Sequence, residues 1–156
     1  MAFCGIVNIT PPTIAVAMSH AHYTNRGIHE NQTFSVNVPS AKMAEAVDWC
    51  GLFSGHREDK SQVFEMFSGK LGIPLIAEAP VNLECKLIQT LDTRPDEVFI
   101  GEIVAVHVDE DCLDDDRPVM GKIDPLMFSM SEKKYYRLGA AIGPAWNIGK
   151  GWKKKE

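Results

Sequence analysis

Polar side chains gather directly after an apolar segment near the start of the chain. Ile14 to Met18 is apolar, and the residues that follow supply a hydroxyl at Ser19, an imidazole at His22 and a second hydroxyl at Thr24. A strand that delivers such groups to a helix N-terminus suits an anion, because unpaired backbone N–H groups and the helix dipole point to the same place. A solvated loop with an ordinary N-cap is the alternative interpretation.

Two further residues could place a positive or hydrogen-bonding group beside a ligand. Lys60 ends a charged, glycine-flanked loop over residues 51–60, and His107 lies near the end of a long apolar segment between two valines. Either residue could lie beside a phosphate or an electron-rich ring. The alternatives are a solvated loop lysine and a half-exposed strand histidine.

Other kinds of catalytic chemistry lack their sequence patterns. The histidines at positions 20, 22, 29 and 56 have no partners at the spacing of a metal site. We find no G-x-S-x-G, no P-loop, no G-x-G-x-x-G and no cysteine at a helix N-terminus beside a histidine. The sequence therefore predicts neither a metal site nor a nucleophilic catalytic residue.

Composition indicates one ordinary globular domain. The 156 residues are 45% hydrophobic and 24% charged, with a net charge of −5, which argues against a protein that binds nucleic acid. We expect no secretory signal and no membrane span, because no apolar run approaches about 20 residues. Four widely spaced cysteines without a C-x-x-C pattern favour reduced thiols and a cytoplasmic location.

The pattern of apolar residues predicts several strands and two short helices. We expect strands over residues 6–9, 14–18, 33–38, 81–88 and 98–109, a helix over 41–49 capped by Ser40, and irregular structure over 69–80. Thr24 or Asn25 would cap a short helical turn, and another would span 61–67. Gly101 indicates a bulge or bend, and the acidic segment 109–116 indicates a solvated hairpin loop. These elements predict an antiparallel barrel or sandwich.

In their order along the chain, several short segments resemble the flavin reductase-like family with its FMN-binding split barrel, and within it the flavoredoxin branch. The matching segments are Ala2–Asn8, Tyr23–Thr24, Phe34–Pro39, Glu45–Gly51, Ser54–Gly55 with Asp59–Lys60, Pro80–Lys86, Phe99–Val108 and Tyr135–Gly139. The resemblance covers residues 1–139 as one FMN-binding split-barrel domain. Residues 140–156, with two tryptophans and several glycines, would form a C-terminal tail that packs on a partner subunit or stays mobile.

The resemblance implies a mainly β fold, an antiparallel split β-barrel of Greek-key type with a few short helices. It also implies a homodimer that holds one FMN per subunit, non-covalently, near the subunit interface. Electrons would pass from NAD(P)H to the flavin, or from the flavin to another acceptor such as a redox protein. Such a protein needs no general base or nucleophile, because the cofactor carries the redox chemistry.

The resemblance also implies the residues of the site. Backbone of Ala2, Cys4 and Gly5 would line the flavin, with Phe3 as a neighbouring aromatic residue. Ser19 and Thr24 would approach the phosphate, with His22 where relatives often carry arginine. The remaining expected contacts with the flavin or the partner subunit come from Lys60, His107, Tyr135 and Tyr136.

One departure from the family pattern leaves a second function open. Relatives carry an asparagine and a threonine that help to bind the phosphate, just before the position of Met1. Without them, the alternative is a non-catalytic split-barrel binding protein in which the FMN site is weakened or lost.

Overall fold

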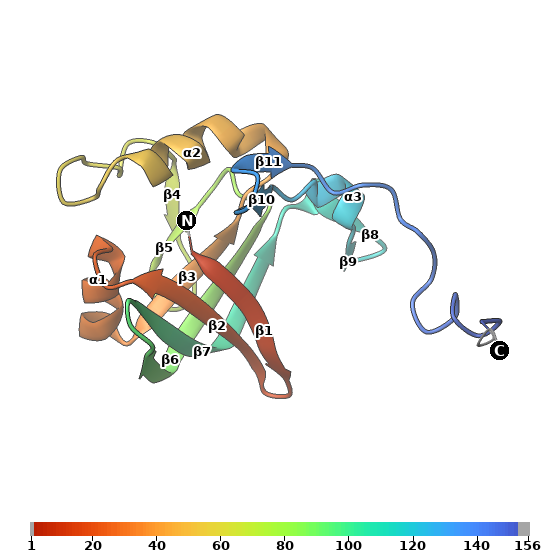
Figure 1. The fold of residues 1–156 in the computed structure, drawn as a ribbon, viewed down its shortest axis with the longest axis horizontal. Coiled ribbons are helices and arrows are strands. Elements are labelled where there is room, and N and C mark those ends of the chain that lie inside the picture. Colours follow the sequence, from red (N-terminus) through yellow and green to blue (C-terminus); the bar gives the residue numbers. More distant parts are fainter. Residues whose placement is uncertain (1, 153–156) are drawn as a thin grey trace.

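A five-stranded antiparallel sheet organises the molecule. The computed structural model describes residues 2–152. The strands of the main sheet follow the order β1-β2-β7-β6-β3, with β1 and β3 at its edges. The sheet curves strongly, with α1 and α2 beside it at one end (Figure 1). The expected mainly β, antiparallel split-barrel fold with few helices is confirmed.

The strands of the main sheet are longer than the small strands around them. The main sheet contains β1 (Phe3–Ile9), β2 (Pro12–Ser19), β3 (Thr33–Val38), β6 (Val81–Asp92) and β7 (Asp96–Val108). Three small hairpins pair β4 (Met66–Ser68) with β5 (Pro74–Ile76), β8 (Leu113–Asp114) with β9 (Arg117–Pro118), and β10 (Met127–Ser129) with β11 (Lys134–Tyr136). The helices are α1 (Tyr23–Asn31), η1 (Ala41–Met43), α2 (Ala44–Leu52), η2 (Glu110–Cys112) and α3 (Met120–Ile123).

The core lies between the curved sheet and α1. Alternate residues of β2 are buried there, and Phe34 and Phe99 lie among them, at 6% and 0% exposure. Gly101 of β7 faces Phe34, and a Cβ atom at Gly101 would lie 2.6 Å from two atoms of the ring. The glycine therefore lets an aromatic ring approach the strand closely.

The bulge or bend expected at Gly101 is found where β7 pairs with β6, because the register shifts between the pairs Leu87–Gly101 and Gln89–Ile100. Gly101 pairs regularly with Ile14 of β2. The shifts in register between β6 and β7 leave Ile88 and Val104 without direct partners. Strong curvature is thus distributed over two bulges on either side of Gly101, as expected where a barrel strand bends.

Three local predictions are corrected. The segment 61–67 does not form a helical turn, because Met66 and Phe67 belong to β4 and pair with β5. Helix α1 begins at Tyr23 with His22 as its N-cap, so Thr24 and Asn25 lie inside the helix instead of capping it. Ser40 precedes a 3₁₀ turn and makes no side-chain capping bond. Long-range strand pairing outweighs the local helical preference in the first case.

The polar face expected for β6 is buried at two positions. Asn82 and Glu84 are 4% and 0% exposed, although they alternate with apolar residues along the strand. Backbone from the segment between β4 and β5 covers Glu84, whose carboxylate accepts hydrogen bonds from the N–H groups of Lys70 and Leu71 at 2.7 and 2.6 Å. Hydrogen bonds thus allow a charged side chain to be buried there.

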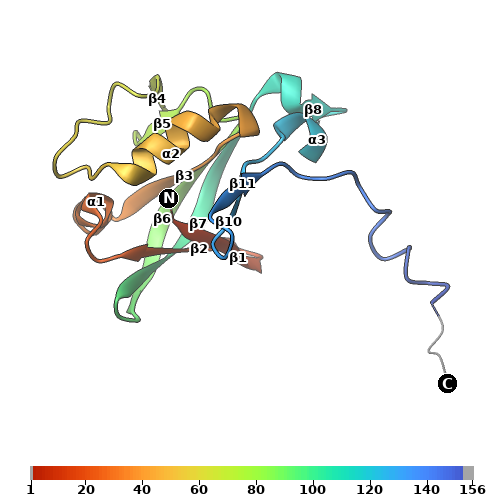
Figure 2. The ribbon, with the colours of Figure 1, turned by 45° about the horizontal axis from the view of Figure 1, so that its top comes forward.

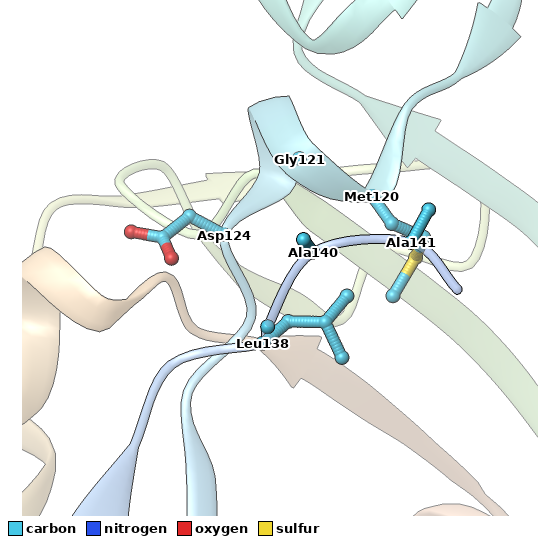
Figure 3. Close-up of a pocket in the computed structure, with 7 residues that line it drawn as sticks. Met120, Gly121, Asp124, Leu138, Ala140 and Ala141 are labelled. Atoms are coloured by element: carbon cyan, nitrogen blue, oxygen red, sulfur yellow. The ribbon is translucent and has the colours of Figure 1, made fainter.

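Residues 140–152 leave the body of the molecule as an arm (Figures 1 and 2). Trp146 and Ile142 on this arm are 96% and 93% exposed. At its root, Arg137 forms an ion pair with Asp124 at 3.0 Å. Figure 3 shows Leu138, Ala140 and Ala141 running beside α3, with a cavity of about 330 Å³ between them.

Candidate functional site

The N-terminus of α1 follows directly from the end of β2. Ser19 is the last residue of β2 and pairs with Asp96 of β7. The carbonyl of Ser19 accepts a hydrogen bond from the N–H of His22 at 2.9 Å, which fixes the turn into the helix. No side chain caps the first turn, and that turn contains no acidic residue. An uncapped helix N-terminus beside hydroxyl and imidazole groups is a favourable place for an anion.

The loop that carries Lys60 reaches the same helix N-terminus. Nζ of Lys60 donates to the carbonyl of Cys50 in α2 at 2.5 Å, so the ammonium is held in place by the end of that helix. Farther back in the loop, Gly55 lies against Tyr23, and the rings of Tyr23 and His56 meet edge to face at 5.0 Å. An ammonium has three donors, so Lys60 retains donors for a ligand.

The charge of His22 depends on these neighbours. Partial burial lowers the pKa of His22 below 6.5, nearby positive charge including Lys60 lowers it further, and Asp96 opposes the shift. His22 is therefore mainly neutral at pH 7, and an anion bound here would favour its protonated form.

The first residues of β1 lie at the same end of the sheet. Phe3 pairs with Ala17 and Gly5 with Ala15, close to Ser19 on β2. Every residue of β1 is exposed, with Phe3 at 58%. Ala2, Phe3, Cys4 and Gly5 thus provide an accessible strand edge and an aromatic ring near the anion-binding groups.

The structure reveals a buried carboxylate beneath α1 that the sequence did not single out. Glu97 is 7% exposed, and its Oε2 accepts a hydrogen bond from Nδ2 of Asn25 at 3.3 Å, while its Oε1 lies 2.9 Å from Nε2 of His29. These contacts orient α1 against β7. Alternation with Phe99 along β7 was the available signal, because it places Glu97 on the buried face.

The structure places His107 at the opposite end of β7. His107 pairs with Asn82, whereas Asp96, the partner of Ser19, begins the strand. Nε2 of His107 donates to Oε1 of Glu84 at 2.7 Å. Burial alone would raise the pKa of Glu84, but the bonds from His107, Leu71 and Lys70 outweigh it and hold this pKa below its ordinary value. The pair stabilises the fold at this end.

Tyr135 and Tyr136 lie on β11, and they differ in their partners. The hydroxyl of Tyr135 donates to Asp48 of α2 at 2.8 Å, and burial together with this bond raises the pKa of Tyr135 to about 12. The hydroxyl of Tyr136 donates to Glu132 at 2.8 Å, beside its own strand. Within one subunit, Tyr135 therefore links β11 to α2 and helps to position that helix.

The four cysteines are free thiols, and their environments differ. Cys4 is exposed in β1, whereas Cys85 is fully buried in the core. Burial and the charge of Glu84 raise the pKa of Cys85 to about 12, and burial also raises the pKa of Cys112. Only an exposed thiol can react readily, so Cys4 is the accessible cysteine of the candidate site.

Two features of residues 2–152 bear on other functions. Within that range, no group of three or more histidine, cysteine or acidic side chains is placed to hold a metal ion. No helix in the same range is long and apolar enough to cross a membrane. The histidines at positions 20 and 29 instead form ion pairs with carboxylates, to Asp92 at 3.2 Å and to Glu97 at 2.9 Å.

The fold agrees with comparisons to known proteins. The family model for the flavin reductase like domain matches residues 1–138, and the chain belongs to this family. The flavoredoxin of Methanosarcina acetivorans is 40% identical, with a TM-score of 0.92 over 95% of this chain and 80% of that one. The flavoredoxin of Desulfovibrio vulgaris (Miyazaki F) is 37% identical, with a TM-score of 0.87 over 94% and 81%.

Curated relatives add an activity at lower similarity. The FMN reductase (NADH) RutF of Escherichia coli is 27% identical over 108 residues, which are 68% of this chain and 63% of RutF. The chain spans between 56% and 66% of the length of the first curated relatives that it matches. The alignments with both flavoredoxins cover more than the residues up to Gly139 could supply, so they extend into the arm.

Proposed function

We propose that this chain binds FMN non-covalently and works as an oxidoreductase or electron carrier of the flavoredoxin type. Electrons would enter from NAD(P)H or from a reduced partner and leave to another acceptor. Membership of the flavin reductase-like family supports a flavin as the ligand. The similar proteins named flavoredoxin and FMN reductase support a redox role for it.

The observation that carries the proposal is the group of donors around the N-terminus of α1. Ser19, His22, Thr24 and Lys60 come from three separate elements, and the fold brings them to one uncapped helix end. This donor set fits a phosphate, which takes several hydrogen bonds and a compensating positive charge. In this assignment Lys60 provides the charge, His22 donates a hydrogen bond and gains charge as the anion binds, and the two hydroxyls fix the orientation.

The accessible start of β1 fits the flavin ring. Phe3 offers an apolar surface beside the donor group, and the backbone of Ala2, Cys4 and Gly5 offers hydrogen-bonding groups at a strand edge. When bound, FMN supplies the redox chemistry, and the chain positions it and excludes water from it. Catalysis of this kind needs no general base from the chain.

The exposed β1 also supports the homodimer. As an edge strand it presents unpaired backbone groups, and its residues Phe3, Ile6, Val7 and Ile9 are between 56% and 84% exposed. Such an edge is normally covered in the working protein. A second copy over β1 would close the flavin site from the other side. The same proposal includes contacts of His107, Tyr135 and Tyr136 with the flavin ring or with the partner subunit.

An FMN titration of the purified full chain tests the proposal. We expect binding in the micromolar range or tighter, seen as a change in the visible flavin spectrum, and bleaching of bound FMN by dithionite. Bleaching by NADH or NADPH would identify a nicotinamide donor, whereas bleaching only by a reduced protein would identify a carrier. A chain that leaves the flavin spectrum unchanged would favour the alternative of a split-barrel protein whose FMN site is lost.

A further inference from the structure

The arm over residues 140–152 has an ordered shape of its own. The N–H groups of Asn147 and Ile148 donate to the carbonyl of Pro144, at 3.4 and 3.0 Å, and that of Trp152 donates to Gly149 at 3.1 Å. The side chain of Ile148 folds back over Gly143, where a Cβ atom would lie 2.8 Å from its terminal carbon. The arm is thus a compact turn on an extended stalk (Figure 2).

Four large apolar side chains of the arm are largely exposed within this subunit. Ile142, Trp146, Ile148 and Trp152 are 93%, 96%, 61% and 77% exposed. A tryptophan side chain buries roughly 150–250 Å² of surface when it is packed against other groups. Two exposed tryptophans therefore contribute little of the hydrophobic free energy that their burial would supply. Scattered exposed apolar residues are common, but four on one short ordered turn indicate a docking segment.

We propose that the arm docks on a second copy of this chain, with Trp146 and Ile142 as its central contacts. The inference rests on the homodimer of the proposed function and adds a contact that the exposed β1 does not supply. Two-fold symmetry would make the exchange reciprocal, with each arm covering the body of the other subunit. Two tryptophans per arm would provide roughly half of the about 800 Å² that each partner buries in a standard interface.

Charge favours the body of another copy as the docking surface. Residues 140–156 contain four lysines and one glutamate, whereas residues 1–139 contain 12 basic and 20 acidic residues. The C-terminal segment 140–156 thus has a net charge opposite to that of residues 1–139, and such complementarity steers association and specifies the partner. The stalk directs the arm away from its own body, which leaves the body of a second copy to receive it.

The root of the arm contacts the body of its own subunit beside α3. Arg137 pairs with Asp124 at 3.0 Å, and Leu138 to Ala141 run beside α3 (Figure 3). The alignments with the two flavoredoxins extend beyond this root. Anchoring reduces the entropy that docking must overcome, because the stalk is already oriented.

Fluorescence quenching of Trp146 tests the inference in the full chain. The double substitution Trp49→Phe and Trp152→Phe leaves Trp146 as the only tryptophan. Acrylamide quenching and sedimentation equilibrium are measured over the same range of protein concentrations. We expect Trp146 to be protected in the dimer and to become accessible to acrylamide when dilution yields monomer. Raised salt should weaken the dimer, so the protection should be lost at a higher protein concentration.

Substitutions in the arm provide the second measurement. Trp146→Ser and Ile142→Ser should each weaken dimerisation by at least about tenfold. Met130→Ser, at a side chain that is 57% exposed on the turn between β10 and β11, is the matched control and should have no such effect. All three positions are exposed within one subunit, so folding should be unaffected.

Three outcomes would overturn the inference. Trp146 accessible to acrylamide in a dimer means that the dimer forms without the arm. Trp146 protected in a monomer means that the arm folds onto its own body. A chain that stays monomeric at all concentrations removes both the arm exchange and the homodimer, whereas an FMN titration of the same sample separately decides whether the cofactor assignment stands.

Discussion

The two ends of strand β7 use similar residue types in opposite ways. At one end, Glu84 and His107 form a 2.7 Å hydrogen bond, with the carboxylate fully buried and bonded to backbone as well. At the other end, His22 and Lys60 lie near an uncapped helix N-terminus that still offers donors. Satisfied polar groups stabilise a fold, whereas unsatisfied donors gathered in one place are available to a ligand.

Thiol reactivity should separate the two ends most widely. Cys4 is exposed near the donor group, and Cys85 is buried beside Glu84 with a pKa raised to about 12. We expect iodoacetamide to modify Cys4 at least about a thousandfold faster than Cys85, because Cys85 reacts only after the structure opens. Mass spectrometry of peptides over time measures both rates. Slowing of the Cys4 reaction by added FMN would strengthen the cofactor assignment, and equal rates would contradict the contrast.

Loss of His107 should lower stability more than any change at the ligand end. His107→Ala removes the charged-group hydrogen bond from a carboxylate that stays buried, and we expect a loss of about 3 kcal/mol in the free energy of unfolding. Urea unfolding at pH 7 measures it. Asp109→Asn, at an exposed residue just beyond β7, is the control and should change stability by less than about 0.5 kcal/mol.

The same pair gives a defined pH dependence. Because the pKa of Glu84 is lowered in the folded state, its carboxylate contributes stability above the ordinary glutamate value of about 4.3. That contribution is lost as the pH falls through the lower folded value. Glu84→Gln should therefore flatten the acid limb of the stability curve, and an unchanged acid limb would mean that other carboxylates dominate it.

Loss of Lys60 should affect FMN and leave the fold nearly intact. Lys60→Ala removes a charge-assisted donor near His22, and we expect FMN binding to weaken by about 1–3 kcal/mol. Lys86→Ala removes an equal charge from an exposed position on β6 and is the matched control. Equal effects of the two substitutions on FMN affinity would assign the Lys60 effect to net charge alone.

His22 should give FMN binding a small pH dependence. The pKa of His22 is lowered in the protein without ligand, and a bound phosphate would favour the protonated imidazole. Affinity should therefore rise a few-fold as the pH falls from about 7.5 to 6.5, above the second pKa of a phosphate monoester near 6. Comparison of FMN titrations for the wild type and His22→Gln isolates the contribution of the imidazole.

The sequence predicted strand β3 well and strand β1 poorly, although both lie at edges of the main sheet. Strand β3 was predicted with its observed bounds, because Phe34, Val36 and Val38 alternate with polar residues. Strand β1 was expected only from Ile6, since an edge strand exposed on both faces has no alternation to reveal it. Alternation of apolar and polar residues reflects burial on one face of a strand. A strand that is exposed within its own subunit therefore shows no such alternation.

For the candidate site, the sequence could nominate residues and could not group them. Ser19, His22 and Thr24 are close along the chain, so the anion interpretation needed only local geometry. Lys60 joins them through a loop, and His107 lies at the far end of β7, which no spacing rule could show. Residue types set the available chemistry, whereas long-range strand pairing decided which of them meet.

Helix α2 contacts both the root of the arm and the ligand end. Tyr135, two residues before Arg137, donates to Asp48, and the carbonyl of Cys50 on the same helix holds Lys60. If arm docking shifts α2, the same shift moves Lys60. Thermodynamic linkage then requires reciprocity: the factor by which dimerisation changes FMN affinity equals the factor by which FMN changes dimerisation. A single helix would make assembly and cofactor loading one coupled equilibrium.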